Sequence, residues 1–126
     1  MARILIVEDS PANMMLVETL LESCGHTLFQ AERAPQALDI ARREQLDLIL
    51  MDIQLPGMDG IEATRILKAD PRTSGVPVVA LTAFAMKGDR ERLLQAGCDG
   101  YIEKPINYID FLAEVAAIIE RADPAP

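Results

Sequence analysis

The stretch at residues 46–57 reads LDLILMDIQLPG. Its apolar part is nearly continuous rather than alternating, which is typical of a β-strand that is buried on both faces. The run ends at Asp52, and Pro56 and Gly57 then turn the chain. A carboxylate at the end of a buried strand is costly, because its charged form loses hydration there. The stretch therefore predicts a buried parallel sheet with a functional aspartate at one edge.

Runs of similar composition recur along the whole chain. We expect strands at residues 3–8, 27–31, 47–52, 77–82 and 100–103. We expect helices at about residues 11–24, 35–45, 60–69, 86–96 and from 107 onward. Regular alternation of strand and helix indicates a parallel sheet covered by helices. The strand at 27–31 is the most polar of the set, which favours a place at the sheet edge.

This pattern predicts a single α/β domain with a flavodoxin-like, doubly wound sheet of five parallel strands and five helices. The strand order common to such sheets is 2-1-3-4-5, with right-handed connections. We assign the domain to residues 1–122 and expect a frayed tail at 123–126.

The first helix carries its own start and stop signals. Ser10 is suited to cap its N-terminus, and Pro11 fits the first helical position. Gly25 is suited to end it.

Composition and charge indicate which partners the protein avoids and in which compartment it is expected. The formal net charge of −8 opposes direct binding to DNA or to anionic membranes. No basic-then-apolar leader opens the sequence, and no apolar run reaches the length of a membrane span. We therefore expect a cytoplasmic protein that does not insert into membranes. Cys24 and Cys98 are expected to be buried thiols in a reducing compartment.

Polar side chains gather where the predicted strands end. Glu8 and Asp9 follow the first strand, Asp52 ends the third, Thr82 ends the fourth, and Lys104 follows the fifth. In the expected order these ends lie side by side, about 4.8 Å apart from strand to strand. Ligands of doubly wound sheets bind beyond these ends, where the strand order reverses. The sequence thus predicts one site, between the first and third strands.

The chemistry of this set favours a cation and a phosphoryl group. Crowded carboxylates repel one another and burial raises their pKa values, which a hard divalent cation such as Mg²⁺ relieves. Lys104 adds a positive charge and Thr82 a hydroxyl donor, which suits the charged oxygens of a phosphoryl group. Asp52 is then a candidate nucleophile. Each residue alone has an ordinary explanation as a cap, a solvated side chain or a partner of a helix dipole, so the argument rests on the combination.

Four segments resemble a known family. They are residues 6–9, 50–60, 80–83 and 100–105, and they occur in the order and spacing of the receiver domain of two-component response regulators. The likeness covers nearly the full length, and the stretch at 82–89 is similar to single-domain members. This resemblance implies that Asp52 accepts a phosphoryl group from a phosphohistidine, borne by a sensor histidine kinase or a histidine phosphotransfer protein.

The resemblance also implies a metal site. Asp9 would bind Mg²⁺ directly and Glu8 mainly through water. Asp52 and the backbone carbonyl of Gln54 would complete the protein ligands.

The resemblance further implies a switch. Thr82 and Lys104 would contact the phosphoryl oxygens, and Tyr101 would turn inward as Thr82 moves. The Lys104–Pro105 bond would be cis, as receivers have there. The helix at 86–96, the strand at 100–103 and the last helix would then bind an allosteric target, or the phosphoryl group would pass on. Such a chain is a signalling switch that catalyses only its own phosphotransfer and dephosphorylation, not an enzyme.

Receivers commonly dock a helical phosphohistidine protein through their first helix and the loop after the fifth strand. The matching positions are Asn13, Met14, Val17, Pro105, Ile106 and Asn107. Phe84, two residues past Thr82, could hinder attacking water and prolong the phosphoryl lifetime.

Two other classes of protein are alternatives for this fold with an aspartate at the end of a strand. A phosphohydrolase of the haloacid dehalogenase type needs a second acid two residues after the nucleophile, where this chain has Gln54. A flavin or nucleotide binding module needs a loop rich in Gly, Ser or Thr after the first strand, where this chain has the acidic pair Glu8 and Asp9.

Overall fold

The strands form a single sheet at the centre of the molecule. A computed structural model describes residues 2–83, 87–104 and 106–122. The strands are β1 (Arg3–Val7), β2 (Thr27–Ala31), β3 (Leu48–Asp52), β4 (Val78–Thr82) and β5 (Gly100–Glu103). They are all parallel and lie in the order β2-β1-β3-β4-β5. The predicted fold class and strand order are confirmed, and β2 is an edge strand as expected.

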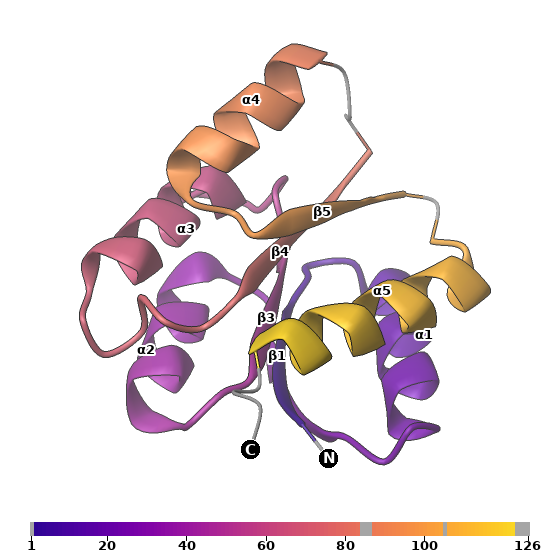
Figure 1. The fold of residues 1–126 in the computed structure, drawn as a ribbon. Helices are drawn as coiled ribbons and strands as arrows, with labels where there is room; N and C mark the ends of the chain where they lie inside the picture. Colours follow the sequence, from indigo (N-terminus) through magenta and orange to yellow (C-terminus); the bar gives the residue numbers. More distant parts are fainter. Residues whose placement is uncertain (1, 84–86, 105, 123–126) are drawn as a thin grey trace.

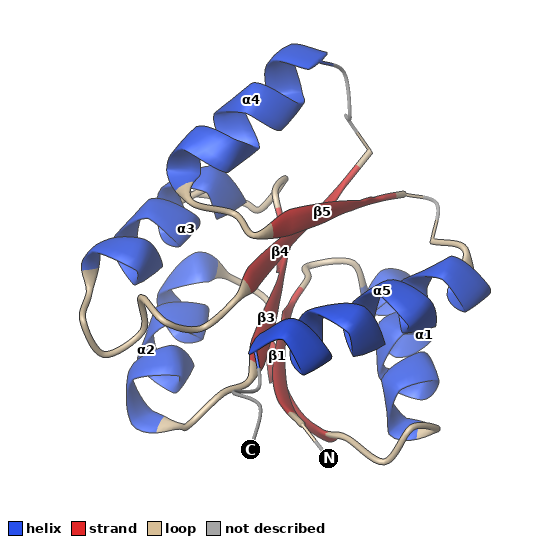
Figure 2. Cartoon of the chain, viewed as in Figure 1, coloured by secondary structure: helices blue, strands red, loops and turns tan. Residues whose placement is uncertain are grey.

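Helices cover both faces of the sheet. They are α1 (Pro11–Glu22), α2 (Ala34–Arg43), α3 (Gly60–Ala69), α4 (Lys87–Ala96) and α5 (Tyr108–Ala122). Helices α1 and α5 lie on one face, and α2, α3 and α4 on the other (Figure 1). Strand and helix alternate through the described part of the chain (Figure 2). None of the described helices combines the length and apolar character needed to span a bilayer.

The two-sided cover explains the continuous apolar strands. On β1, Ile4 and Ile6 pack in the core shared with α1 and α5, whereas Leu5 and Val7 pack in the core shared with α2 and α3. Successive side chains of a strand point to opposite faces, so both sets must be apolar when both faces are covered.

Helix α1 begins as predicted but ends earlier. The Asn13 N–H donates to Ser10 Oγ at 3.4 Å, with Pro11 as the first helical residue. The helix ends at Glu22, and Gly25 adopts a positive φ of 81° in the following turn. Cys24 lies in that turn and is exposed, so the prediction of a buried thiol is wrong there. It is confirmed for Cys98.

Helix α3 begins directly against the end of β3. Asp59 Oδ1 accepts a hydrogen bond from the Glu62 N–H at 2.9 Å and caps the helix. A Cβ atom at Gly60 would overlap the backbone carbonyl oxygen of Asp52 and lie 2.8 Å from Ile53 Cα. Only glycine lets the start of α3 come this close to the end of β3. This close packing fixes the backbone that carries Asp52.

Candidate functional site

The ends of β1 and β3 lie side by side at one edge of the sheet. Val7 pairs with Met51 across the two strands, so Glu8, which directly follows β1, lies next to Asp52, the last residue of β3. Both side chains are buried, with relative exposures of 1% for Glu8 and 4% for Asp52. Asp9 is exposed. The pattern of strand ends thus placed these residues correctly.

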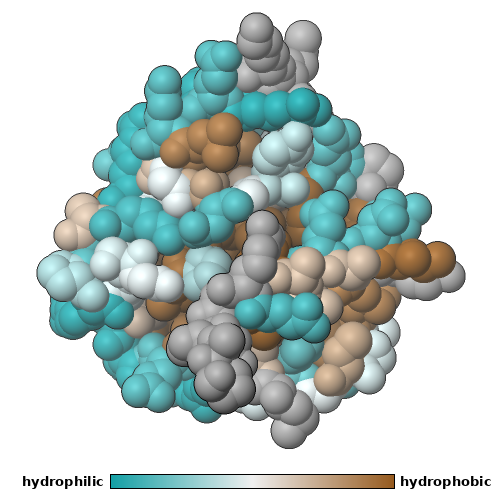
Figure 3. Space-filling view, viewed as in Figure 1, coloured by the Kyte–Doolittle hydropathy of each residue, from teal (hydrophilic) through white to brown (hydrophobic). Residues whose placement is uncertain are grey.

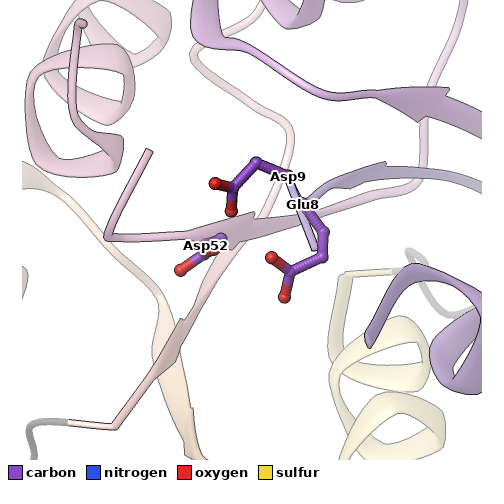
Figure 4. Close-up of side chains that lie close together, drawn as sticks. All are labelled: Glu8, Asp9 and Asp52. Carbon is purple, nitrogen blue, oxygen red and sulfur yellow. The ribbon is translucent and has the colours of Figure 1, made fainter. Parts of the chain in front are cut away.

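The three carboxylates share one space. One oxygen each from Glu8, Asp9 and Asp52 lies within 4.8 Å of the others. Figure 4 shows the carboxylates gathered where β1 and β3 end. Three hard oxygen donors at this separation can hold a divalent cation, which prefers such ligands.

Lys104 closes the cluster from the far side. Its Nζ lies 2.7 Å from Glu8 Oε1 and 3.5 Å from Asp52 Oδ1. Its backbone N–H donates to the Thr82 carbonyl oxygen at 2.8 Å, which ties the loop after β5 to the end of β4. A single ammonium therefore contacts two buried carboxylates.

Burial and neighbouring groups shift the pKa values of the two buried acids, Glu8 and Asp52, in opposite directions. Burial raises the pKa of Asp52 to about 7, and hydrogen bonding and repulsion with Glu8 act in the same direction. Lys104 and the Gln54 N–H, which donates to Asp52 Oδ1 at 3.0 Å, oppose this only in part. Near neutral pH, the protonated and the charged forms of Asp52 are therefore both populated.

The pKa of Glu8 shifts the other way. Burial raises it, but hydrogen bonding with Asp52, with Lys104 and with the Ser10 N–H outweighs burial and holds it below its ordinary value. The expectation that burial raises the pKa values of the crowded carboxylates is confirmed for Asp52 and wrong for Glu8. The difference arises because the hydrogen bond between the two acids lowers the pKa of Glu8 and raises that of Asp52, and because Lys104 lies closer to Glu8 than to Asp52.

Thr82, Gln54 and Tyr101 occupy different places around the cluster. Thr82 is buried at the end of β4, and its neighbour Leu81 pairs with Asp52. Gln54 is exposed beside the site. Tyr101 is half-buried in β5, opposite Ala80, and lines a groove toward α5 rather than the carboxylate cluster.

Three expectations lie outside the described residues, one of them the frayed tail at 123–126. Phe84 and Pro105 are not described, so neither the effect of Phe84 on water nor the cis peptide bond at Pro105 enters the site.

The face of α1 predicted for docking includes two buried residues. Met14 and Val17 are buried in the core, so the prediction that they contact a partner is wrong. Met15 is 69% exposed and Leu16 is 40% exposed. The adjacent Met14 and Met15 are chemically alike, and only packing onto the sheet decides which one is buried.

Sequence reasoning missed Gly60 as a positioning residue. The available signal was a glycine directly after Asp59, a good capping residue, a few positions past a strand-end aspartate. The contact with the Asp52 carbonyl is visible only in the folded chain.

Comparisons with known proteins converge on one family. The sequence profile of the response regulator receiver domain matches residues 4–116. The polar-differentiation response regulator DivK of Brucella anthropi is 46% identical over 119 residues, which is 94% of this chain and 97% of DivK.

Solved structures agree. The receiver domain of the sensor histidine kinase PA1611 from Pseudomonas aeruginosa, which has a magnesium ion coordinated in its active site cleft, is 39% identical with a TM-score of 0.88. The match covers 94% of this chain and 98% of that domain. A CheY-like receiver domain protein from Methanospirillum hungatei is 32% identical with a TM-score of 0.88, over 97% of this chain and 96% of that one.

Proposed function

The chain belongs to the response regulator receiver domain family, and from this premise we propose that Asp52 is the residue that accepts the phosphoryl group. Membership of the family and the phosphorelay signalling inferred from the motifs are confirmed. The observation that carries the assignment to Asp52 is its position: a buried carboxylate between Glu8, Asp9 and the Lys104 ammonium.

The transfer itself needs only an oxygen nucleophile and a good leaving group. A carboxylate oxygen of Asp52 attacks the phosphorus of a phosphohistidine, and the new P–O bond forms as the P–N bond breaks. The imidazole nitrogen leaves with the electron pair of that bond. Catalysis of such transfers is mostly positioning and charge stabilisation. Lys104, 3.5 Å from Asp52 Oδ1, and the Thr82 hydroxyl supply contacts to the phosphoryl oxygens.

The acidic cluster fits Mg²⁺. Glu8, Asp9 and Asp52 offer only oxygen donors, and the exposure of Asp9 leaves one side open to water, as Mg²⁺ requires. With the backbone carbonyl of Gln54 they would form the protein ligands. Bound there, the ion offsets the negative charge of carboxylates and phosphoryl oxygens. The related PA1611 receiver, which holds magnesium in its cleft, supports this assignment.

Phosphorylation then acts as a charge switch. It adds about −1.5 to −2 charges and three acceptor oxygens at Asp52. We infer that Thr82 moves toward these oxygens and that Tyr101 turns inward, which changes the surface formed by α4, β5 and α5. That surface carries exposed apolar side chains, Leu94 on α4 and Ile109 on α5. Figure 3 shows hydrophobic areas over α4 and near the start of α5. A partner protein binds there, or the phosphoryl group passes on.

The donor is a protein phosphohistidine. A sensor histidine kinase or a histidine phosphotransfer protein docks over the exposed Met15 and Leu16 of α1, and Met15 lines the same hollow as Glu8 and Asp9. The chain catalyses only its own phosphorylation and dephosphorylation, and it acts in the cytoplasm.

Intact mass after incubation with acetyl phosphate and Mg²⁺ tests the assignment. We expect one added phosphoryl group on the wild type and none on Asp52→Asn. Asp39→Asn is the matched control, because Asp39 is an exposed aspartate on α2, away from the site, and this variant should gain the group. A phosphorylated Asp52→Asn protein would overturn the assignment. If no protein gains mass, the same set is incubated with a phosphohistidine protein.

A further inference from the structure

Arg90 on α4 reaches across to β5 and contacts the side chain proposed to switch. Its guanidinium carbon lies 5.2 Å from the centre of the Tyr101 ring. The same guanidinium lies 3.6 Å from Glu103 Oε1. Tyr101 and Glu103 are two residues apart on a strand and so lie on the same face, which lets one arginine contact both.

The contact stabilises the observed position of the ring. A guanidinium over an aromatic face is attracted by the ring's electron density, and Glu103 holds that guanidinium in place. Arg90 and Glu103 are both about half exposed, so the contribution is modest. A modest contribution is sufficient to bias two conformations of similar free energy.

The neighbourhood of Tyr101 offers the ring another place. Tyr101 pairs with Ala80, a small buried residue on the same face of β4 as Thr82. Beyond Thr82, a hollow of about 260 Å³ lies between the end of β4, the start of α3 and α4, lined in part by Ile61 and Leu93. A movement of Thr82 toward Asp52 would open a path for the ring from the surface toward this hollow.

We propose that Arg90 latches Tyr101 at the surface of β5 and thereby sets how readily the receiver enters its switched state. This rests on the proposed function, in which Tyr101 turns inward when Asp52 is phosphorylated. The Arg90–Tyr101 contact must break for the ring to move. It therefore lowers the population of the switched state and, by the same factor, the affinity for a phosphoryl group mimic.

Binding of beryllofluoride in the presence of Mg²⁺ measures this population. We compare the wild type with Arg90→Met, which keeps the side-chain length but removes the guanidinium. We expect binding roughly two- to fivefold tighter, the range typical of exposed cation–aromatic contacts. Arg65→Met is the matched control, since Arg65 is an exposed arginine on α3 that pairs with Glu62, and it should bind as the wild type does. Equal affinity in all three proteins would overturn the proposal.

A double-variant cycle separates the ring from the charge. In a Tyr101→Ala background, Arg90→Met should leave beryllofluoride affinity unchanged, because the latch has lost its partner. An undiminished gain in that background would assign the effect to charge alone and overturn the proposal.

The ring can also be observed without any mimic. The chain has two tyrosines, so a Tyr108→Phe background labelled with fluorotyrosine reports Tyr101 alone by fluorine NMR. We expect Arg90→Met to broaden the fluorine resonance of the ring, because a ring that is no longer held exchanges more between its surface and inward positions. An unchanged line width would overturn the latch. If the wild type binds no beryllofluoride, the proposed function fails, yet this measurement still decides the latch.

Discussion

At the scale of residues, the notable feature of the site is an unequal division of charge between two buried acids. Hydrogen bonds with Asp52 and Lys104 hold the pKa of Glu8 below its ordinary value, whereas burial and Glu8 itself raise the pKa of Asp52 to about 7. Asp52, the proposed nucleophile, is thus the buried acid whose charged form the protein stabilises less.

Asp52→Asn should remove a pH dependence of stability. The pKa of Asp52 is raised from its ordinary 3.8 to about 7 in the folded chain. Between these two pH values, the folded chain therefore binds more protons than the unfolded one. Stability therefore falls as pH rises through this window. Without divalent ions, the free energy of unfolding of Asp52→Asn should exceed that of the wild type by about 2–4 kcal/mol at pH 8, and by much less near pH 4.

Urea unfolding at pH 5 and pH 8 in the presence of a chelator measures this effect. Glu8 acts in the opposite direction, but its pKa is lowered, so its contribution is lost only below its ordinary 4.5. In Asp39→Asn, the free energy of unfolding should change between the two pH values as it does in the wild type. The same change in Asp52→Asn would show that the pKa of Asp52 is not raised.

At the scale of elements, the site depends on how closely α3 begins against β3. The Gly60 N–H donates to the Ile53 carbonyl at 3.0 Å, and no Cβ atom stands between helix and strand. Asp59 caps the same helix at 2.9 Å. These two residues set the path of the chain directly after Asp52.

Gly60→Ala should destabilise the fold and displace Asp52. The added methyl group would overlap backbone atoms of Asp52 and Ile53, which cannot give way as a flexible side chain does. We expect a loss of about 2 kcal/mol or more in unfolding free energy, as for other overpacked positions. Urea unfolding and phosphorylation by acetyl phosphate measure the two effects.

Gly75→Ala is the control for this substitution. A Cβ atom at Gly75 would meet nothing within 4 Å. The free energy of unfolding of Gly75→Ala should therefore stay within about 0.5 kcal/mol of that of the wild type. Equal stability of the two variants would show that β3 and α3 do not approach so closely.

At the scale of the whole molecule, the site exists only when the sheet is complete. Glu8 and Asp9 come from the end of β1, Asp52 from β3, Thr82 from β4 and Lys104 from the loop after β5. These segments are far apart in sequence, and the unfolded chain has no such cluster. A ligand of the cluster therefore stabilises the entire fold.

Mg²⁺ should raise the melting temperature in a pH-dependent way. A ligand that binds only the folded state stabilises it in proportion to the logarithm of its concentration above Kd. The gain should be larger at pH 8 than at pH 5.5, because the ion competes with the proton on Asp52. Differential scanning fluorimetry over a Mg²⁺ series measures the shift.

Asp9→Asn distinguishes site binding from a general ionic effect. Asp9 is exposed and its substitution leaves no buried charge unpaired, so the variant should fold normally but gain less from Mg²⁺. An identical gain in this variant and the wild type would place the ion elsewhere.

The sequence by itself determined the sheet, its order and the set of residues at its edge. Continuous apolar runs, helical periods and capping signals are local patterns, and a parallel sheet brings every strand end such as Asp52 to the same edge. The start of α1 at Ser10 and Pro11 was predicted for the same reason. Motifs of the receiver family supplied roles for these positions, which the proposed experiments test.

Only the tertiary structure decided how these residues share their interactions. It showed that Lys104 lies closer to Glu8 than to Asp52, that Met15 rather than Met14 faces solvent, and that Arg90 covers Tyr101. Each of these depends on a few ångströms between atoms from segments distant in sequence. Charge interactions and packing change steeply over such distances, whereas the periodicity that predicts a strand or helix does not depend on them.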